Sequence, residues 1–188
     1  MILTLTGASG AGKTTIAERL IATMPDAHFL TSFTTRAARP SDLPGEYDYL
    51  SNDAFDNMEA RGEFLWTARV ADTRHGTTRS SLQAALDNET SISIMILVPE
   101  VLTKLCDFAG AIGKRDAIRP VLITTPPEGI LRARMRERGD EDAKIEARIA
   151  ATLDYEAKAK ATGITFIEIA NEGDANEAVR MITDANNT

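Results

Sequence analysis

Near the N-terminus, glycine, lysine and hydroxyl residues recur at a spacing suited to holding phosphate. The segment from Gly7 to Thr14 reads GASGAGKT, which is glycine, four residues, glycine, lysine and Ser or Thr. It comes directly after an apolar run, Ile2 to Thr6, and opens a helical pattern. Glycines let backbone N–H groups close around phosphate oxygens, and a helix N-terminus favours the same anion. The segment therefore predicts a phosphate-binding loop for a nucleoside triphosphate.

Two side chains of this loop have chemistry suited to phosphoryl transfer. Lys13 would reach the β- and γ-phosphates, and the Thr14 hydroxyl would bind Mg²⁺. A glycine turn that merely joins a strand to a helix, with Lys13 solvated, is the alternative. The loop does not indicate whether the γ-phosphate goes to water, a protein or a small molecule. The residues predicted to contact the triphosphate are Gly7, Ser9, Gly10, Ala11, Gly12, Lys13, Thr14 and Thr15.

The elements that must position the loop alternate along the chain. The apolar runs of strand length are Ile2 to Thr6, His28 to Phe33, Phe64 to Ala71, Ser91 to Val98, Arg119 to Thr124 and Ile164 to Ile169. Helical spacing of apolar residues is present at Lys13 to Met24, Asp53 to Arg61, Thr78 to Asn88, Pro126 to Arg138, Asp142 to Ala161 and Asp174 to Asp184. This alternation predicts an α/β fold with a largely parallel sheet. Ala37 to Tyr49 and Ala109 to Ala117 are expected to be surface loops.

Length and composition describe one ordinary domain. The chain has 188 residues, 43% of them hydrophobic, and a formal charge of −7. Its single cysteine, Cys106, excludes a disulfide framework and a thiol zinc cluster, so a reducing, cytoplasmic setting is expected. No apolar stretch approaches the ~20 residues that span a bilayer, and the acidic balance argues against a broad nucleic-acid surface. We therefore expect neither a membrane nor a nucleic-acid polymer as a partner, while the oligomeric state is open.

Further motifs follow the loop in a fixed order. They are Ser32 to Pro40 (SFTTRAARP), Gly45 to Tyr49 (GEYDY), Phe55, Gly62 to Leu65 (GEFL) and Gly76-Thr77. In this order and close to this spacing, the chain resembles the guanylate kinase family from its N-terminus to about its last helix. The resemblance implies an α/β P-loop kinase three-layer fold with a parallel core sheet, a small acceptor-binding lobe and a helical lid. It also implies transfer of a phosphoryl group from ATP, with Mg²⁺, to a nucleoside monophosphate.

The resemblance divides the single domain, residues 1–188, into three parts. Residues 1–31, 81–125 and 162–188 would form the core. Residues 32–80 would form the lobe that binds a small phosphorylated acceptor. Residues 126–161 would form the lid and its flanking helices.

Matching residue by residue implies an acceptor site in the lobe. Ser32, Arg36, Arg39 and Tyr47 match the family's contacts to the acceptor phosphate, and Thr77 matches its base-contacting hydroxyl. Two guanidinium forks can hold a phosphomonoester bidentately and orient it for in-line attack. For an isolated pair, ordinary surface arginines would be the alternative. The full set expected to bind the acceptor is Ser32, Arg36, Arg39, Tyr47, Trp66, His75 and Thr77.

Arginines of the expected lid match the family's contacts to the ATP phosphates. Arg134 and Arg138 are four residues apart and share a helix face, and Arg148 follows one helix later. They would neutralise charge on the transferred group. Arg132 and Arg136 are expected to form salt bridges on an exposed helix. The resemblance thus adds Arg134, Arg138 and Asn171, the last at the family's adenine contact, to the ATP-binding set, and makes Lys13, Arg36, Arg134 and Arg148 the catalytic set.

The chain departs from the family at the positions that read the base. Trp66 and Met95 stand where the family has carboxylates that accept hydrogen bonds from guanine, and Leu97 replaces an aspartate associated with magnesium. As the only tryptophan, Trp66 either fills the core of the lobe or stacks on a base or sugar. Arg74 and His75 replace a tyrosine pair. They either meet an additional anion and the phosphate, respectively, or are solvated loop residues.

Three alternatives stay open after this matching. The acceptor is either GMP, the family's nominal acceptor, or another phosphomonoester such as ribose 1,5-bisphosphate or a different nucleotide. Guanylate-kinase-like domains of scaffold proteins bind phosphopeptides, so a non-catalytic module is the alternative of another class; the intact Lys13 and Thr14 argue against it. Mg²⁺ would be held by Thr14, ATP and water, or also by Glu100 just past Pro99.

Overall fold

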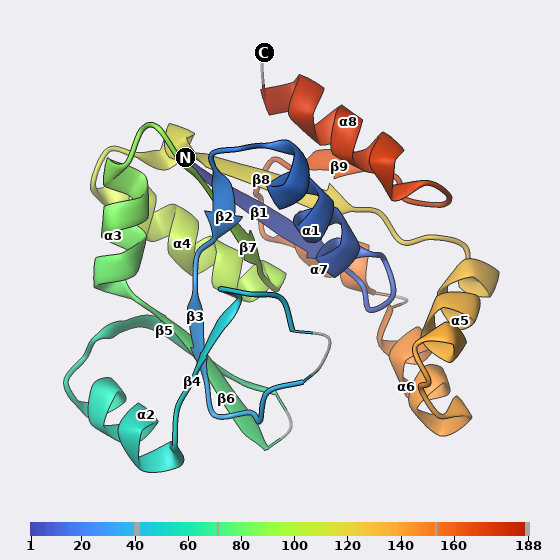
Figure 1. The fold of residues 1–188 in the computed structure, drawn as a ribbon, viewed down its shortest axis with the longest axis horizontal. Helices are drawn as coiled ribbons and strands as arrows, with labels where there is room; N and C mark the ends of the chain where they lie inside the picture. Colours follow the sequence, from blue (N-terminus) through green and yellow to red (C-terminus); the bar gives the residue numbers. More distant parts are fainter. Residues whose placement is uncertain (40–41, 71, 153, 187–188) are drawn as a thin grey trace.

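The core of the protein is a sheet of five parallel strands in the order β2-β7-β1-β8-β9 (Figure 1). The computed structural model describes residues 1–39, 42–70, 72–152 and 154–186. The strands are β1 (Ile2–Gly7), β2 (Ala27–Phe29), β7 (Ile92–Ile96), β8 (Ile118–Ile123) and β9 (Ile167–Ile169). Every residue of the central strand β1 is buried. This is the α/β fold with a parallel sheet that the sequence predicts.

Helices cover both faces of the core sheet and make three layers. They are α1 (Lys13–Thr23) and α8 (Ala175–Asn186) on one face, and α3 (Arg79–Asp87), α4 (Pro99–Ala111) and α7 (Tyr155–Ala161) on the other. Successive side chains of β1 point to opposite faces. Leu3 and Leu5 therefore belong to the apolar cluster of α1 and α8, whereas Ile2 belongs to the cluster of α3 and α4.

A second sheet, in the order β4-β3-β6-β5, lies below the core in Figure 1. Its elements are β3 (Ser32–Thr34), β4 (Tyr47–Tyr49), β5 (Phe64–Val70) and β6 (Thr73–Thr78), with α2 (Asn52–Ala60) beside them. The strand predicted at His28 to Phe33 is therefore two strands in two sheets. The Leu30 N–H still donates to the Ile94 carbonyl in the core at 3.0 Å, whereas the Ser32 N–H donates to the Glu46 carbonyl at 3.1 Å. The chain changes sheets at this point because its pairing partner changes.

A β-bulge in β5 decides which of its side chains face the core. Phe64 pairs with Thr78 and Trp66 pairs with Thr77, so β5 carries one extra residue at this point. Residues two apart on a regular strand share a face. Because of the bulge, Phe64 instead stacks on Phe55 of α2 at a centroid distance of 4.6 Å, while Trp66 joins the apolar cluster of α3 and α4.

An arm of two helices, α5 (Glu128–Glu137) and α6 (Asp142–Thr152), lies at the right of Figure 1, across from the second sheet. It has an apolar cluster of its own, made of Leu131, Met135, Ile145 and Ile149. The single helix predicted from Asp142 to Ala161 is therefore two helices, α6 and α7, with residue 153 between them outside the described residues.

Three elements lie where none is predicted: β4, β6 and α4. The expected loop from Ala109 to Ala117 begins inside α4 and ends in a 3₁₀ helix, Arg115–Ala117. Two residues of the sequence predictions lie outside the described residues. They are Pro40, the last residue of the SFTTRAARP motif, and Ala71, the last residue of the strand predicted at Phe64 to Ala71. In the described part of the chain, no helix has the length and apolar character needed to cross a membrane.

The packing at Gly76 in β6 generates a test of the second sheet. A Cβ there would lie 2.9 Å from Phe64 Cδ1 and 3.1 Å from the Trp66 carbonyl oxygen. We expect Gly76→Ala to lower the free energy of unfolding by about 1–3 kcal/mol through overpacking, measured by urea denaturation. Gly129→Ala is the matched control, because Gly129 has open space around it in α5. Equal stability of the two variants would contradict the packing described for Gly76.

Candidate active site

The loop between β1 and α1 has the geometry that the glycine pattern predicts. Gly10 and Gly12 have φ angles of 82° and 95°, in the left-handed region that favours glycine. Gly12 is also the N-cap of α1. A Cβ on Gly7 would lie 2.8 Å from the Ile123 carbonyl oxygen, so β8 leaves no room for a side chain there. The loop is thus a tight turn at a helix N-terminus, an arrangement that binds phosphate.

Lys13 folds back onto this loop. Its Nζ donates to the carbonyl oxygen of Gly7 at 2.7 Å and to that of Ala8 at 2.9 Å. Desolvation lowers the pKa of the Lys13 ammonium to about 8, and the positive charge of Arg138 acts in the same direction. A phosphate group would offer this ammonium stronger acceptors than the two carbonyls.

Asn171 supports the loop from within the protein. Its side chain is buried, and Nδ2 donates to the Ala11 carbonyl at 2.8 Å. A Cβ on Gly12 would lie 2.2 Å from this Nδ2, so the close approach of Asn171 depends on glycine at position 12. Asn171 does not appear among the described residues that line the neighbouring cavity. Its contact with adenine stays a prediction.

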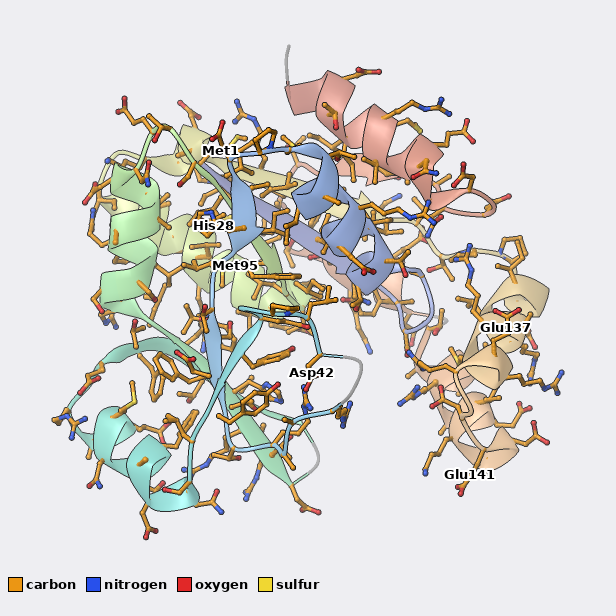
Figure 2. The ribbon with its side chains drawn as sticks, viewed as in Figure 1. Met1, His28, Asp42, Met95, Glu137 and Glu141 are labelled. Carbon is orange, nitrogen blue, oxygen red and sulfur yellow. The ribbon has the colours of Figure 1, made fainter. Side chains whose placement is uncertain are left out.

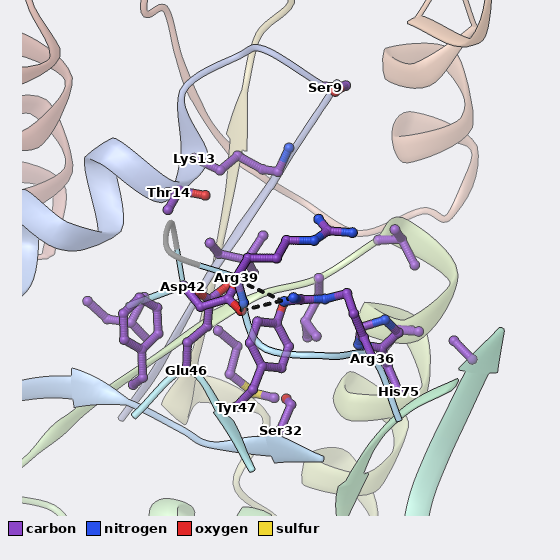
Figure 3. A pocket seen from close by; sticks show the side chains of 18 of the residues that line it. Ser9, Lys13, Thr14, Ser32, Arg36, Arg39, Asp42, Glu46, Tyr47 and His75 are labelled. Atoms are coloured by element: carbon purple, nitrogen blue, oxygen red, sulfur yellow. Dashed lines mark hydrogen bonds and ion pairs between the residues drawn. The ribbon is translucent and has the colours of Figure 1, made fainter. Parts of the chain in front are cut away.

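A cavity of about 1050 Å³ extends from the loop to the second sheet and to the α5–α6 arm. Figure 3 shows Lys13 and Thr14 on one side of it, facing Arg36, Arg39 and Asp42 on the other. The predicted site residues that line it are Ser9, Gly10, Gly12, Lys13, Thr14, Thr15, Ser32, Arg36, Arg39, Tyr47, Trp66, His75, Arg134, Arg138 and Arg148. The others, Gly7, Ala11, Thr77 and Asn171, are buried. Segments far apart in sequence thus meet at one cavity.

On the acceptor side, Arg36 is held by a carboxylate. Its two terminal nitrogens donate to the two oxygens of Asp42 at 2.9 and 2.8 Å, and the side chains are only 10% and 12% exposed (Figure 3). Asp42 also accepts from the Arg39 backbone N–H at 2.7 Å and the Tyr49 hydroxyl at 2.8 Å. The Arg36 hydrogen bond, followed by the backbone bond, lowers the pKa of the Asp42 carboxyl to about 2. Asp42 therefore occupies both terminal nitrogens of Arg36, so an acceptor phosphate would bind Arg36 in competition with this carboxylate.

Aromatic and hydroxyl groups surround this ion pair. The Arg36 guanidinium lies 5.0 Å from the centre of the Tyr47 ring, and the His75 ring meets Tyr47 edge-on at 5.8 Å. Burial, then the charges of Arg36 and Arg39, lowers the pKa of His75, which favours its neutral form. One ring nitrogen of neutral His75 can donate a hydrogen bond to a phosphate oxygen.

Arg74 and His75 face different ways. His75 lines the cavity, but Arg74 turns toward α2, where it pairs with Asp56 and donates to the Asn52 carbonyl at 3.0 Å. Its guanidinium also lies 4.7 Å from the centre of the Phe55 ring. Of the two roles open for Arg74, the structure favours neither the additional anion nor a solvated loop residue: it anchors α2 to β6.

The arginines of the α5–α6 arm fall into two groups. Arg134 Nη1 donates to the Gly10 carbonyl at 3.4 Å, which links the arm to the phosphate loop. Arg138 and Arg148 both pair with Asp140, the latter at 2.6 Å, and both line the cavity. The expected surface salt bridges of the other two arginines are confirmed: Arg132 pairs with Glu128 and Glu146, and Arg136 pairs with Asp142.

Trp66 is a core residue that also forms part of the cavity wall, and its stacking on a base or sugar stays a prediction. It is 6% exposed and packs in the same cluster as Met95 and Leu97, which are also buried. Figure 2 shows Met95 near the boundary between the core sheet and the second sheet. Glu100 is exposed in the first turn of α4 and is not among the described lining residues.

The donor set for magnesium at the described site is sparse. Within the described ranges, no group of three or more His, Cys, Asp or Glu side chains could hold a metal ion. Thr14 lies exposed in the first turn of α1 and lines the cavity beside Lys13. A single protein hydroxyl is enough for a Mg²⁺ site, because this ion usually keeps several waters and takes phosphate oxygens as its other ligands.

Three carboxylates of the cavity wall are absent from the predicted site, and two of them, Asp42 and Asp140, hold arginines. Asp42, Glu46 and Asp140 line the cavity, and none is among the predicted site residues. Asp42 lies six residues after Arg36 in an irregular loop, and Asp140 lies just after Arg138 at a helix end. The only sequence feature that could have identified these carboxylates is their closeness to arginines. Acidic residues near arginines are also typical of surface salt bridges, so this feature does not single them out.

Comparison with known proteins places the chain in a family. The guanylate kinase family model matches residues 1–186. Guanylate kinases of Trichormus variabilis and Salinibacter ruber are 34% and 37% identical over 78% and 75% of this chain, and the matches span 71% and 72% of those proteins. A guanylate kinase of Rhodopseudomonas palustris is 41% identical over 46% of this chain, a stretch that spans only 40% of that protein.

A solved structure extends the comparison to the whole fold. The crystal structure of guanylate kinase from Anaplasma phagocytophilum matches with a TM-score of 0.70 and 22% identity, over 100% of this chain and 84% of that one. The sequence of this chain matches the family model almost from end to end. The matched part contains the phosphate loop, the second sheet and the arginine-bearing arm. The protein belongs to the guanylate kinase family.

Proposed function

We propose that this protein transfers the γ-phosphoryl group of ATP to a nucleoside monophosphate. The observation that carries the proposal is the shared cavity, which brings a phosphate loop with Lys13 together with a second cationic site built on Arg36 and Arg39. A donor triphosphate and an acceptor phosphate both need cationic contacts, and transfer needs them in line. GMP is the family's nominal acceptor, and Trp66 and Met95 are the residues of this chain that bear on the base.

The donor end has four groups with separate tasks. The loop amides and Lys13 would hold the β- and γ-phosphates, and Thr14 would bind Mg²⁺, which neutralises phosphate charge when bound. Arg134 and Arg148 would meet the charge that develops on the transferred group. Arg138 would complete the contact to the triphosphate. This assignment is supported by the common cavity of these residues and by the hydrogen bond from Arg134 to Gly10.

Residues 32–80 would bind the phosphomonoester that accepts the phosphoryl group. Arg36 and Arg39 would bind the phosphate, with Ser32, Tyr47 and neutral His75 as hydrogen-bond donors. We assign residues 126–161 to a lid that closes over the ATP phosphates, and the remainder to the core. Closure would exclude water, so that the phosphoryl group reaches the acceptor instead of being hydrolysed.

The mechanism requires no covalent intermediate and no general base. An acceptor phosphate is already a nucleophile at neutral pH, so Lys13, Arg36, Arg134 and Arg148 would act by positioning it and by stabilising charge.

The decisive experiment is coupled ADP release with Mg-ATP and a panel of nucleoside monophosphates. A non-catalytic module would give no turnover, and its ATP binding would be equally weak in wild type and Lys13→Ala. A cytoplasmic location stays a prediction.

The two neighbouring arginines of α5 allow a matched test of the lid. We expect Arg134→Ala to lower kcat by about 100-fold or more, with little change in the acceptor KM, because its charge would be needed mainly in the transition state. Arg132→Ala is the control, since Arg132 pairs with Glu128 and Glu146 on the surface. The measurement is the kcat and the acceptor KM of both variants by steady-state kinetics. Equal kcat values for the two variants would remove Arg134 from the catalytic set.

Asn171 offers a test of how the triphosphate is held. Removing the Asn171 amide would leave the buried Ala11 carbonyl without its partner and loosen the loop. We expect Asn171→Ala to weaken ATP and GTP binding by a similar factor, about 5- to 30-fold, measured by calorimetry. A contact with adenine predicts a different result, in which ATP binding alone is weakened. Thermal unfolding of the variant checks that the fold is kept.

The lowered pKa of Lys13 predicts how ATP binding depends on pH. The protonated ammonium binds phosphate, so affinity should be constant well below the pKa of about 8 and should fall as pH rises through it. The dissociation constant for ATP should rise by at most about tenfold per pH unit between pH 8 and 9.5. Lys13→Arg is the control, because a guanidinium stays charged in this range. The same pH slope in both proteins would contradict the assignment to Lys13.

A further inference from the structure

Asp140 is the acid of the α5–α6 arm that faces the cavity. It lines the cavity together with Arg138 and Arg148, and its side chain is only 15% exposed. Its acidic neighbours Glu137 and Glu141 are exposed and are not among the described lining residues. A negative charge beside a bound triphosphate opposes its binding. This carboxylate therefore needs a role that compensates for its repulsion of the substrate.

The end of α5 fixes the main chain of Asp140. The Asp140 N–H donates to the Met135 carbonyl at 3.0 Å, and the Gly139 N–H donates to the Arg136 carbonyl at 2.9 Å. Gly139 has a φ angle of 83°, so these two bonds form a Schellman motif with glycine in the left-handed position. Met135 is buried in the apolar cluster of the arm. Asp140 is thus held in place without any contribution from its side chain.

One oxygen of the Asp140 carboxylate accepts from two arginines. Arg138 Nη2 and Arg148 Nη1 both donate to Oδ2, the latter at 2.6 Å. Hydrogen bonds to one atom are each under about 3 Å, so the two nitrogens lie within about 6 Å of each other. Two guanidinium groups this close repel, and the carboxylate between them offsets the repulsion. Asp140 therefore holds a cation at the end of α5 and a cation of α6 at one point.

Both arginines keep donors for a phosphate while they hold Asp140. A guanidinium has five N–H donors, and in the described structure Asp140 engages one terminal nitrogen of each arginine. Arg36 differs, because both of its terminal nitrogens donate to Asp42. A phosphate must displace Asp42 to reach those two nitrogens. Asp140, in contrast, can stay bound to both of its arginines when ATP binds.

The two arginines and Asp140 lie near the phosphate loop. Desolvation and then the charge of Arg138 lower the pKa of the Lys13 ammonium, so the charges of Arg138 and Lys13 interact. Arg134, on the same helix, donates to the Gly10 carbonyl at 3.4 Å. The α5–α6 arm thus meets the loop at the place where a triphosphate would bind.

We propose that Asp140 is a positioning residue for phosphoryl transfer, whose carboxylate holds Arg138 and Arg148 together toward the triphosphate. This proposal rests on the proposed function. Asp140 itself would touch neither ATP nor the acceptor. Arg148 would meet the charge on the transferred group and Arg138 the ATP phosphates, each from a position that Asp140 sets. Groups held in place before the reaction need no reorganisation in the transition state.

The first test replaces the carboxylate by an amide of the same shape. Asp140→Asn should lower kcat about tenfold and raise the KM for ATP about three- to tenfold, because both arginines lose their fixed position. The acceptor KM should not change, since the acceptor site is assigned to residues 32–80. Asp142→Asn is the matched control: Asp142 pairs with Arg136 on the surface and is not a described lining residue. The measurement is steady-state ADP release with Mg-ATP and the best acceptor of the nucleotide panel.

A double mutant shows whether Asp140 acts through an arginine. In a protein that carries Arg148→Ala, Asp140→Asn should change kcat by less than about threefold, because the group that it positions is gone. A merely structural role at the end of α5 would lower kcat by the same factor in both backgrounds, and this additive result would overturn the proposal. A higher kcat or tighter ATP binding in Asp140→Asn would also overturn it, because Asp140 would then compete with phosphate.

The remaining outcomes separate this proposal from the proposed function. If wild type is active and Asp140→Asn and Asp142→Asn have equal kcat values, only the proposal is overturned. If no acceptor supports ADP release, the proposed function is overturned, and ATP binding by calorimetry then decides the proposal. Weaker ATP binding in Asp140→Asn alone would support it, and equal binding in both variants or no binding by wild type would overturn it. Thermal unfolding checks the fold, and Asp140→Ser replaces Asp140→Asn if the latter does not fold.

Discussion

Repulsion among cations is the constraint on which the site depends. The chain is acidic overall, yet one cavity is lined by Lys13, Arg36, Arg39, Arg134, Arg138 and Arg148. Like charges repel strongly where water is partly excluded, so each group needs a counter-ion or a neutral acceptor. Asp42 holds Arg36, Asp140 holds Arg138 and Arg148, and backbone carbonyls hold Lys13. The protein's own acceptors thus occupy four of the cations that phosphates would bind, namely Lys13, Arg36, Arg138 and Arg148.

The sequence predicts best what depends on local pattern. The phosphate loop is recognisable because its glycines, its lysine and its place between a strand and a helix lie within a few residues. The five core strands are found for the same reason, since each lies within a short stretch that is mostly apolar. β4 and β6 are missed because their residues, such as Tyr47 to Tyr49 and Thr73 to Thr78, are polar or aromatic and form strands only through pairing with β3 and β5.

Trp66 illustrates what local pattern cannot give. A bulge depends on how two strands pair, and one extra residue in β5 moves Trp66 from the α2 face to the cavity face. In this position Trp66 both packs in the core and lines the cavity, so core packing does not exclude contact with a ligand. The roles of Asp42 and Asp140 are hidden for the same reason, because only tertiary structure shows which arginines they hold.

The cations that line the cavity come from three parts of the fold, and each part is stabilised by its own contacts. Lys13 belongs to the core sheet's loop, Arg36 to the end of β3, and Arg134 to an arm whose apolar cluster is separate from both core clusters. Packing within each part fixes each cation locally, but none of the apolar clusters of the described residues joins the arm to the second sheet. A ligand that carries phosphate at both ends would neutralise these cations together. Charge pairing across the cavity, rather than burial of apolar surface, is therefore the force that would draw the parts together around substrate.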